Sequence, residues 1–197
     1  MPPNHHTKAE LRPYFLAQRK ALAPAAVSAW SAQICQRLQA FVPADGSTLH
    51  TFLPMAHQQE IDLWPFLKDL WRCCPRVNTC ASVADFATLT MANYFVDAQT
   101  EWTTSRLGIP EPDPNTQTPC PVERIKVVLV PLVTFDEQGY RVGYGKGFYD
   151  RFLAICQPDT VKIGLSFFDP VPEITDVGPN DVRLDYCIGP AKTWRFK

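Results

Sequence analysis

The clearest candidate for chemistry is a glycine-rich segment, GYGKG, at residues 143–147. Because glycine has no Cβ, successive backbone N–H groups in such a segment can turn inward and bind an anion, and the N-terminus of a following helix adds a positive potential. Lys146 places a full positive charge in the same segment. The spacing matches neither the GxGxxG dinucleotide fingerprint nor the P-loop, which requires GxxxxGK followed by serine or threonine. Two interpretations remain open: a phosphate-binding loop, or a turn in which the glycines only let the chain reverse.

Two carboxylates near this segment are candidate metal ligands. Asp150 follows Tyr149 at the start of the helix expected after the glycines, and Asp181 lies in a loop with the sequence GPNDVRLD. Mg²⁺ takes oxygen ligands and often uses only one or two carboxylates beside bound phosphates. Alternatively, Asp150 only complements the helix dipole, worth about 0.3 to 1 kcal/mol, and Asp181 is a turn residue. The spacing alone does not decide between these interpretations.

The elements that must position these residues alternate between strands and helices. Residues 127–130, Val-Val-Leu-Val, form a continuous apolar run typical of a central strand covered on both faces. A segment with five prolines in fourteen residues, 108–121, is expected to be a rigid loop. The other expected strands are 48–53, two within 76–95, 162–165 and 186–188, and the expected helices are 24–41, 62–71 and 148–156. This alternation predicts an α/β fold with a largely parallel sheet.

Composition limits the classes of protein that the chain can belong to. We expect a single domain over residues 1–197, and a net charge of -1 gives no electrostatic reason to expect a nucleic-acid or anionic-membrane partner. No apolar stretch reaches the roughly 18 residues of a membrane helix, and the first residues lack the apolar core of a secretory signal, so a cytoplasmic protein is expected. The seven cysteines show no CxxC pair and are expected to be reduced, buried thiols. Monomer and homodimer remain equally open.

A resemblance extends over nearly the whole chain. Residues 128–154, VLVPLVTFDEQGYRVGYGKGFYDRFLA, resemble the signature region of the 5-formyltetrahydrofolate cyclo-ligases, also called 5,10-methenyltetrahydrofolate synthetases. Four further segments resemble motifs of that family in the same order: KAELR at 8–12, FLPMAHQQEIDL at 52–63, GIPEP at 108–112 and NDVRLD at 180–185. The central motif is specific because the strand, the FD turn, GxGxG and YD occur in one register.

The resemblance implies a three-layer α/β/α sandwich and an enzyme that depends on ATP and Mg²⁺. Its expected reaction converts 5-formyltetrahydrofolate into 5,10-methenyltetrahydrofolate, ADP and phosphate through a phosphorylated formyl (imidate) intermediate. Phosphoryl transfer is catalysed mainly by positioning and charge neutralisation, so no nucleophilic triad is expected. Small molecules, ATP and a reduced folate, are then the expected partners.

The resemblance also assigns roles to individual residues. Glu60 would accept paired N–H donors from a pterin ring, and Leu53 and Met55 would line the apolar part of the pocket. Arg141 would support the glycine loop or a phosphate, or else form a surface ion pair. The full assignment is as follows: catalysis, Lys8, Arg12, Lys146 and Tyr149; ATP, Lys8, Arg12, Arg141, Gly143, Tyr144, Gly145, Lys146, Gly147, Phe148 and Tyr149; folate, Leu53, Met55, Glu60, Tyr144, Gly145, Lys146, Gly147 and Tyr149; Mg²⁺, Asp150 and Asp181.

Departures from the family pattern keep two alternatives open. Pro13 lacks an N–H, so Lys8 is expected in a frayed or kinked first helical turn. Pro170 stands where the family commonly has glutamine, so one polar substrate contact is expected to be absent or supplied by Asp169. The alternatives are another ATP-dependent enzyme with a different amide or carboxylate substrate, and a non-catalytic folate- or nucleotide-binding protein.

Overall fold

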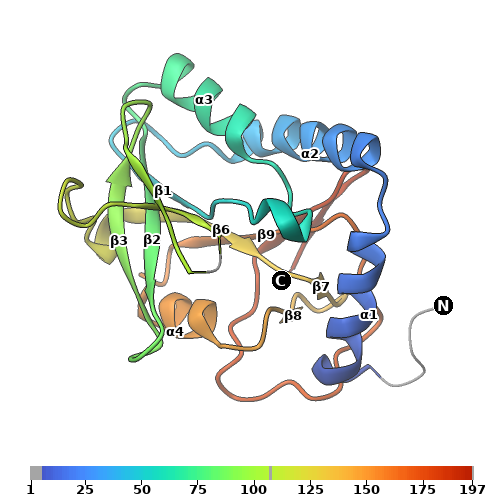
Figure 1. The fold of residues 1–197 in the computed structure, drawn as a ribbon. Coiled ribbons are helices and arrows are strands. Elements are labelled where there is room, and N and C mark those ends of the chain that lie inside the picture. Colours follow the sequence, from blue (N-terminus) through green and yellow to red (C-terminus); the bar gives the residue numbers. More distant parts are fainter. Residues whose placement is uncertain (1–5, 107, 197) are drawn as a thin grey trace.

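The computed structural model describes residues 6–106 and 108–196, and it places a seven-stranded sheet between helices (Figure 1). The strand order is β11-β10-β9-β6-β1-β2-β3. Every neighbouring pair from β10 to β2 is parallel, whereas β11 and β3 are antiparallel to their neighbours. The strands of this sheet are β1 (Thr48–Thr51), β2 (Asn78–Asp85), β3 (Thr90–Val96), β6 (Ile125–Pro131), β9 (Val161–Leu165), β10 (Tyr186–Ile188) and β11 (Thr193–Arg195). The predicted α/β fold with a largely parallel sheet is confirmed.

Two helices, α2 (Pro24–Leu38) and α3 (Trp64–Cys73), cover one face of the sheet (Figure 1). Their apolar stripes include Ile34 and Leu67, which pack with Leu49 of β1 and Leu129 of β6 in the largest buried cluster. Both helices begin with proline in the first turn, a position where its missing N–H costs nothing. The stripe predicted to reach Phe41 instead ends in a short 3-10 helix, η1 (Gln39–Phe41).

The opposite face is covered by α4 (Phe148–Ile155), the helix that follows the glycine segment. Phe152 and Leu153 of α4 pack against Val128 and Val130 of β6, so the central strand is buried on both sides as predicted. The two cores therefore form a three-layer sandwich with α4 fixed directly beneath β6. This packing holds the start of α4 close to the carboxyl end of the sheet.

The N-terminal helix α1 (Lys8–Lys20) packs against a small hairpin of β7 (Thr134–Phe135) and β8 (Arg141–Val142) at the side of the sheet. The expectation of a frayed first turn is wrong. Thr7 caps the helix by accepting a hydrogen bond from the Glu10 N–H, and the Glu10 side chain accepts one from the Thr7 N–H. This capping box offsets the bond that Pro13 removes farther along the helix.

Other expectations need correction at the short elements. The predicted strand 48–53 ends at Thr51, and the proline-rich segment contains a strand, β5 (Pro110–Pro112), paired with β4 (Trp102–Thr104). Prolines are tolerated there because this two-stranded sheet has only edges. The remaining short helices are η2 (Ala56–Gln58) and η3 (Val122–Arg124). Across the described residues, no helix is long and apolar enough to span a bilayer.

The seven cysteines are free thiols, and most are buried or partly buried as expected. Cys73 is the exception, because it lies exposed at the last residue of α3.

Candidate active site

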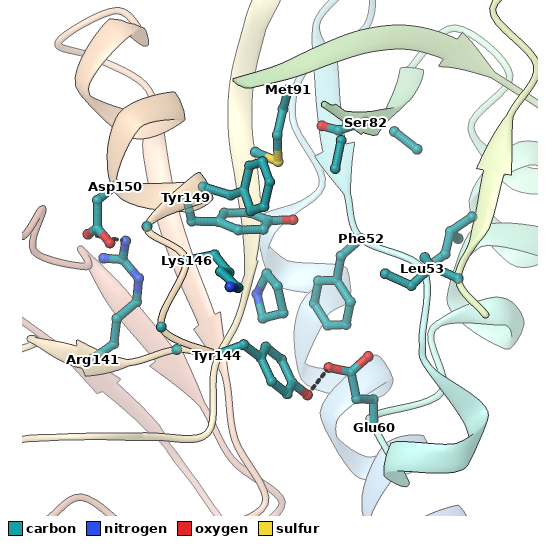
Figure 2. Close-up of a pocket in the computed structure, with 18 of the residues that line it drawn as sticks. Phe52, Leu53, Glu60, Ser82, Met91, Arg141, Tyr144, Lys146, Tyr149 and Asp150 are labelled. Carbon is teal, nitrogen blue, oxygen red and sulfur yellow. Dashed lines mark hydrogen bonds and ion pairs between the residues drawn. The ribbon is translucent and has the colours of Figure 1, made fainter. Parts of the chain in front are cut away.

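A pocket of about 410 Å³ opens where the carboxyl ends of β1 and β6 meet, within the size range of small-molecule sites (Figure 2). Ligands of open α/β sheets usually bind at this edge. The residues of the assignment that line the pocket are Lys8, Arg12, Leu53, Glu60, Arg141, Gly143, Tyr144, Gly145, Lys146, Gly147, Phe148, Tyr149, Asp150 and Asp181. Chain segments far apart in the sequence therefore converge on one cavity.

The glycine segment adopts a backbone that other residues rarely adopt. Gly145 and Gly147 have φ values of 90° and 68°, and Gly147 is the N-cap of α4. The positive φ favours glycine at Gly145, and a Cβ there would lie 3.2 Å from Arg12 Cζ, so the Arg12 side chain would have to shift slightly. Arg12 Nε donates a 2.7 Å hydrogen bond to the Gly143 carbonyl. The segment is therefore a turn held against α1, with a helix N-terminus directly behind it.

Asp150 is held by a buried arginine. Arg141 Nη2 donates to Asp150 Oδ1 at 2.6 Å, and the Val182 N–H donates to the same oxygen at 3.3 Å. Arg141 is only 5% exposed in its side chain, so the alternative of a surface ion pair is wrong. Burial lowers the pKa of Arg141, and the charges of Asp150 and Asp181 oppose that effect. Arg141 contacts Asp150 at the start of α4 (Figure 2). It also donates to the Val182 carbonyl and so joins α4 to the segment that carries Asp181.

Asp181 is paired with Lys8 of α1. Lys8 Nζ and the Gly178 N–H, at 2.6 Å, both donate to Asp181 Oδ2. Burial acts to raise the pKa of Asp181, but the hydrogen bonds from Lys8 and Gly178 and the charges of Lys8 and Arg141 outweigh it, so its pKa lies below the usual value. Asp181 is therefore an ionised carboxylate beside the pocket.

These two carboxylates fit a magnesium ion better than a protein-enclosed metal. The described residues contain no group of three or more His, Cys, Asp or Glu side chains that could hold a metal. The hydrogen bonds above end on Oδ1 of Asp150 and on Oδ2 of Asp181, which leaves the second oxygen of each for another ligand. Mg²⁺ commonly combines one or two carboxylates with water and phosphate oxygens.

Glu60 lies on the other side of the pocket, facing the glycine segment (Figure 2). It is 7% exposed; the Met55 N–H donates to Oε2 at 2.8 Å, and the Tyr144 hydroxyl donates to Oε1. Burial raises the pKa of Glu60, while the hydrogen bonds from Met55 and Tyr144 and the charges of Arg19 and His57 act in the opposite direction. Met55 thus positions Glu60 through its backbone and is not among the lining residues, unlike Leu53.

Arg19 is the functional candidate that the sequence analysis missed. Its Nη2 donates to the Tyr144 hydroxyl, which places a buried cation behind Glu60. A signal was present, because Arg19 continues the buried stripe of Leu11 and Phe15 at a spacing of four residues. A charged residue at an apolar position of a helix indicates a buried partner.

Aromatic and apolar side chains complete the walls. The Tyr149 ring packs edge-on against His50, with centroids 6.0 Å apart, and burial raises the pKa of Tyr149, so its hydroxyl stays a proton donor. Further lining residues that sequence reasoning did not find include Phe52, Ser82, Phe86, Met91, Ile109 and Pro131. Neither Asp169 nor Pro170 is among the described lining residues. The expected replacement of a family glutamine by Asp169 is therefore not supported.

The fold and the site define a class, an α/β protein in which a glycine turn and two carboxylates, Asp150 and Asp181, line one pocket at the carboxyl edge of the sheet. Comparison with known proteins makes the assignment specific. The model of the 5-formyltetrahydrofolate cyclo-ligase family matches residues 4–190. The 5-formyltetrahydrofolate cyclo-ligase of Escherichia coli strain K12 is 31% identical over 182 residues, 91% of this chain and 98% of its own. The chain belongs to the 5-formyltetrahydrofolate cyclo-ligase family.

Solved structures agree with this assignment. A 5,10-methenyltetrahydrofolate synthetase from Mycoplasma pneumoniae is 25% identical with a TM-score of 0.70, and the match covers 93% of this chain and 98% of that one. The synthetase from Aquifex aeolicus is 24% identical with a TM-score of 0.76, covering 96% and 93%, and at that identity it supports the fold alone.

Proposed function

We propose that this protein uses ATP to close the ring of 5-formyltetrahydrofolate, giving 5,10-methenyltetrahydrofolate, ADP and phosphate. Its family makes it an ATP-dependent ligase. The observation that carries the proposal for this chain is a single pocket with two chemically different ends. One end gathers the cations of Lys8, Arg12 and Lys146 around a glycine turn, and the other presents the buried carboxylate of Glu60.

The chemistry explains why such a pocket needs both ends. The oxygen of an N-formyl group is a poor leaving group, whereas phosphate is a good one. Attack of the formyl oxygen on the γ-phosphate of ATP gives a phosphorylated imidate and ADP, and attack by the second folate nitrogen then closes the ring and releases phosphate. Enzymes accelerate phosphoryl transfer mainly by alignment and charge neutralisation, which cations and backbone N–H groups supply.

The phosphate end is organised by α1 and the glycine turn. Arg12 is fixed through Nε on the Gly143 carbonyl, which leaves its two terminal nitrogens to donate to phosphate oxygens. Lys146 lies exposed on the turn and adds a positive charge at the pocket. The N–H groups at the start of α4 complete this anion site.

Asp150 and Asp181 would hold Mg²⁺ through their second oxygens. When bound, the ion neutralises negative charge that develops on the phosphate oxygens. Arg141 holds Asp150 in place, and Lys8 does so for Asp181, so each metal ligand has a cation that fixes its orientation.

The folate end is organised by Glu60 and aromatic side chains. A carboxylate accepts two N–H donors side by side, which suits the amino-pyrimidine edge of a pterin. Phe52 and Leu53 supply an apolar surface beside it (Figure 2), and the protonated Tyr149 hydroxyl is a donor for the reacting part of the folate.

A spectrophotometric assay tests the proposal. Purified protein with 5-formyltetrahydrofolate, ATP and Mg²⁺ should give the near-ultraviolet absorbance of the methenyl product, and omitting any one of the three should abolish it. Folded protein that binds both substrates without forming product would indicate the non-catalytic binder. Consumption of ATP only with another amide or carboxylate would indicate the alternative enzyme.

A further inference from the structure

Arg19 is a buried cation that the reaction scheme above does not use. It lies near the carboxyl end of α1 and is 5% exposed. Nη1 lies 3.5 Å from the Leu132 carbonyl, Nη2 donates to the Tyr144 hydroxyl, and Nε has no partner among the described residues. Burying a guanidinium with incomplete hydrogen bonding costs free energy. The burial of Arg19 beside Tyr144 therefore requires a compensating role.

The donor inventory fixes the direction of the hydrogen bonds. Arginine only donates, so the Tyr144 oxygen must accept from Arg19 Nη2. The single Tyr144 proton is then directed at Glu60 Oε1, which accepts it. The result is a relay from Arg19 through Tyr144 to Glu60, across separations of 125 and 84 residues in the chain.

The relay also affects the position and the ionisation of the Glu60 carboxylate. With Tyr144 on Oε1 and the Met55 N–H on Oε2, both carboxylate oxygens are fixed in place. Burial raises the pKa of Glu60, and the positive charge of Arg19 is among the influences that lower it. The Arg19 guanidinium further lies 5.6 Å from the centre of the Tyr144 ring, so it holds the ring as well as the hydroxyl.

We propose that Arg19 is a positioning residue that fixes the Tyr144 hydroxyl on Glu60, and thereby joins the glycine turn to the folate-binding carboxylate. This inference rests on the proposed role of Glu60 in binding folate. Arg19 lies behind Glu60 and is not among the residues that line the main pocket, so it acts on folate through these two partners.

The test compares Arg19→Met, Tyr144→Phe and the double variant in steady-state assays. Each single change should raise the KM for 5-formyltetrahydrofolate about tenfold, the value of a hydrogen bond to a charged group. The KM for ATP should stay within about twofold. Because both changes break one relay, the double variant should be no worse than Arg19→Met alone. Arg19→Lys, which keeps the charge, should recover part of the loss.

Lys20→Met is the matched control, because Lys20 is exposed on the same helix. It should leave both KM values unchanged. Additive losses in the double variant, equal rises in both KM values, or an unchanged folate KM in folded Arg19→Met would each overturn the relay. If Arg19→Met does not fold, Tyr144→Phe still tests it, because an unchanged folate KM there also overturns it.

The failure of the relay and the failure of the proposed function are distinguishable. Wild-type protein without methenyl product refutes the function, whereas normal wild-type turnover with unchanged variants refutes only the relay. Equilibrium binding of 5-formyltetrahydrofolate, measured by calorimetry, should show the same tenfold weakening in Arg19→Met and Tyr144→Phe. It tests the relay without any need for turnover.

Discussion

Asp150 carries the sharpest expectation for a single residue. Asp150→Asn keeps the shape of the side chain but removes the negative charge that would attract Mg²⁺. We expect kcat to fall about a hundredfold or more, because charge neutralisation by a metal is worth several kcal/mol. The KM for folate should change less than about threefold, because Glu60 lies at the other side of the pocket. Steady-state assays over a Mg²⁺ titration measure both effects.

The control for this change is Asp159→Asn. Asp159 also forms an ion pair, with Lys126 at 2.9 Å, but it is exposed and outside the pocket. It should retain wild-type kinetics. Full activity of Asp150→Asn at limiting Mg²⁺ would contradict the metal assignment. If activity falls, thermal melting distinguishes lost metal binding from unfolding caused by the unpaired Arg141.

Glu60 gives the matching prediction for the folate side. Glu60→Gln should raise the KM for 5-formyltetrahydrofolate about 10- to 100-fold, because hydrogen bonds to a charged acceptor contribute about 1.5 to 3 kcal/mol. The KM for ATP should not change. Glu137→Gln, an exposed residue outside the pocket, is the control. Equal losses for both substrates would mean that Glu60 supports the pocket as a whole.

The pH dependence of folate use should also depend on Glu60. Because its pKa is raised, Glu60 becomes protonated at a higher pH than an ordinary glutamate as the pH falls. Folate kcat/KM should therefore decline on the acid side above the usual range of glutamate, and Glu60→Gln should lose this limb. A profile measured with saturating ATP checks it, and an identical acid limb in the variant would assign the ionisation to another group.

The sequence predicted which residues line the pocket better than it predicted which of them contact one another. The chemistry of the GYGKG segment and of Asp150 was inferred from the residues, and Lys8 was assigned through the family resemblance; all of them line the pocket. The Arg19–Tyr144–Glu60 relay joins three segments, and hydrophobic periodicity contains no information on which pairs meet. Arg141 was left between two roles for the same reason, because its partner Asp150 is reached only through the fold.

Pro13 gives a prediction for an element, α1. It is exposed in the helix interior, where proline removes the hydrogen bond to the Ala9 carbonyl. Pro13→Ala should stabilise the protein by about 2 kcal/mol, since the gain in helix propensity of about 3 kcal/mol is partly offset by a more flexible unfolded chain. For a chain of this size the melting temperature should rise by about 5 °C.

The same substitution at another helix serves as its control. Pro24 occupies the first turn of α2, where proline is favoured, so Pro24→Ala should give no gain. An unchanged or lower melting temperature for Pro13→Ala would mean that the surrounding contacts have adapted to the proline, and that its absent N–H carries no cost.

The elements predicted well are those with long and regular patterns. The apolar stripe of α2 predicts a helix packed on a sheet. The continuous apolar run of β6 predicts a strand covered on both faces. The short strands β7 and β11 were missed because two or three residues are too few to show a period, although the equally short β10 was predicted. β5 was missed because its strand-breaking prolines are acceptable only in a sheet without a central position.

At the scale of the whole molecule, the three layers place a neutral histidine where it controls acid stability. His50 of β1 is fully buried beneath α4, with its ring 4.8 Å from Phe152. Nε2 lies 2.7 Å from Ser82 Oγ, and Ser82 donates its proton to Asn93, so His50 Nε2 must carry the proton of the first bond. Burial lowers the pKa of His50 to about 3.

Because burial lowers the pKa of His50, protonating it at low pH destabilises the folded state. The folded state favours neutral His50, so its contribution to stability is complete above the unfolded value of about 6.5 and is lost as the pH falls toward 3. His50→Gln cannot titrate, and its free energy of unfolding should depend less on pH in that window, by up to about 1.4 kcal/mol per pH unit. Urea unfolding at pH 7.5, 6, 5 and 4 measures the slopes. Equal slopes in the wild-type protein and in His50→Gln would place the acid sensitivity of the fold in its carboxylates.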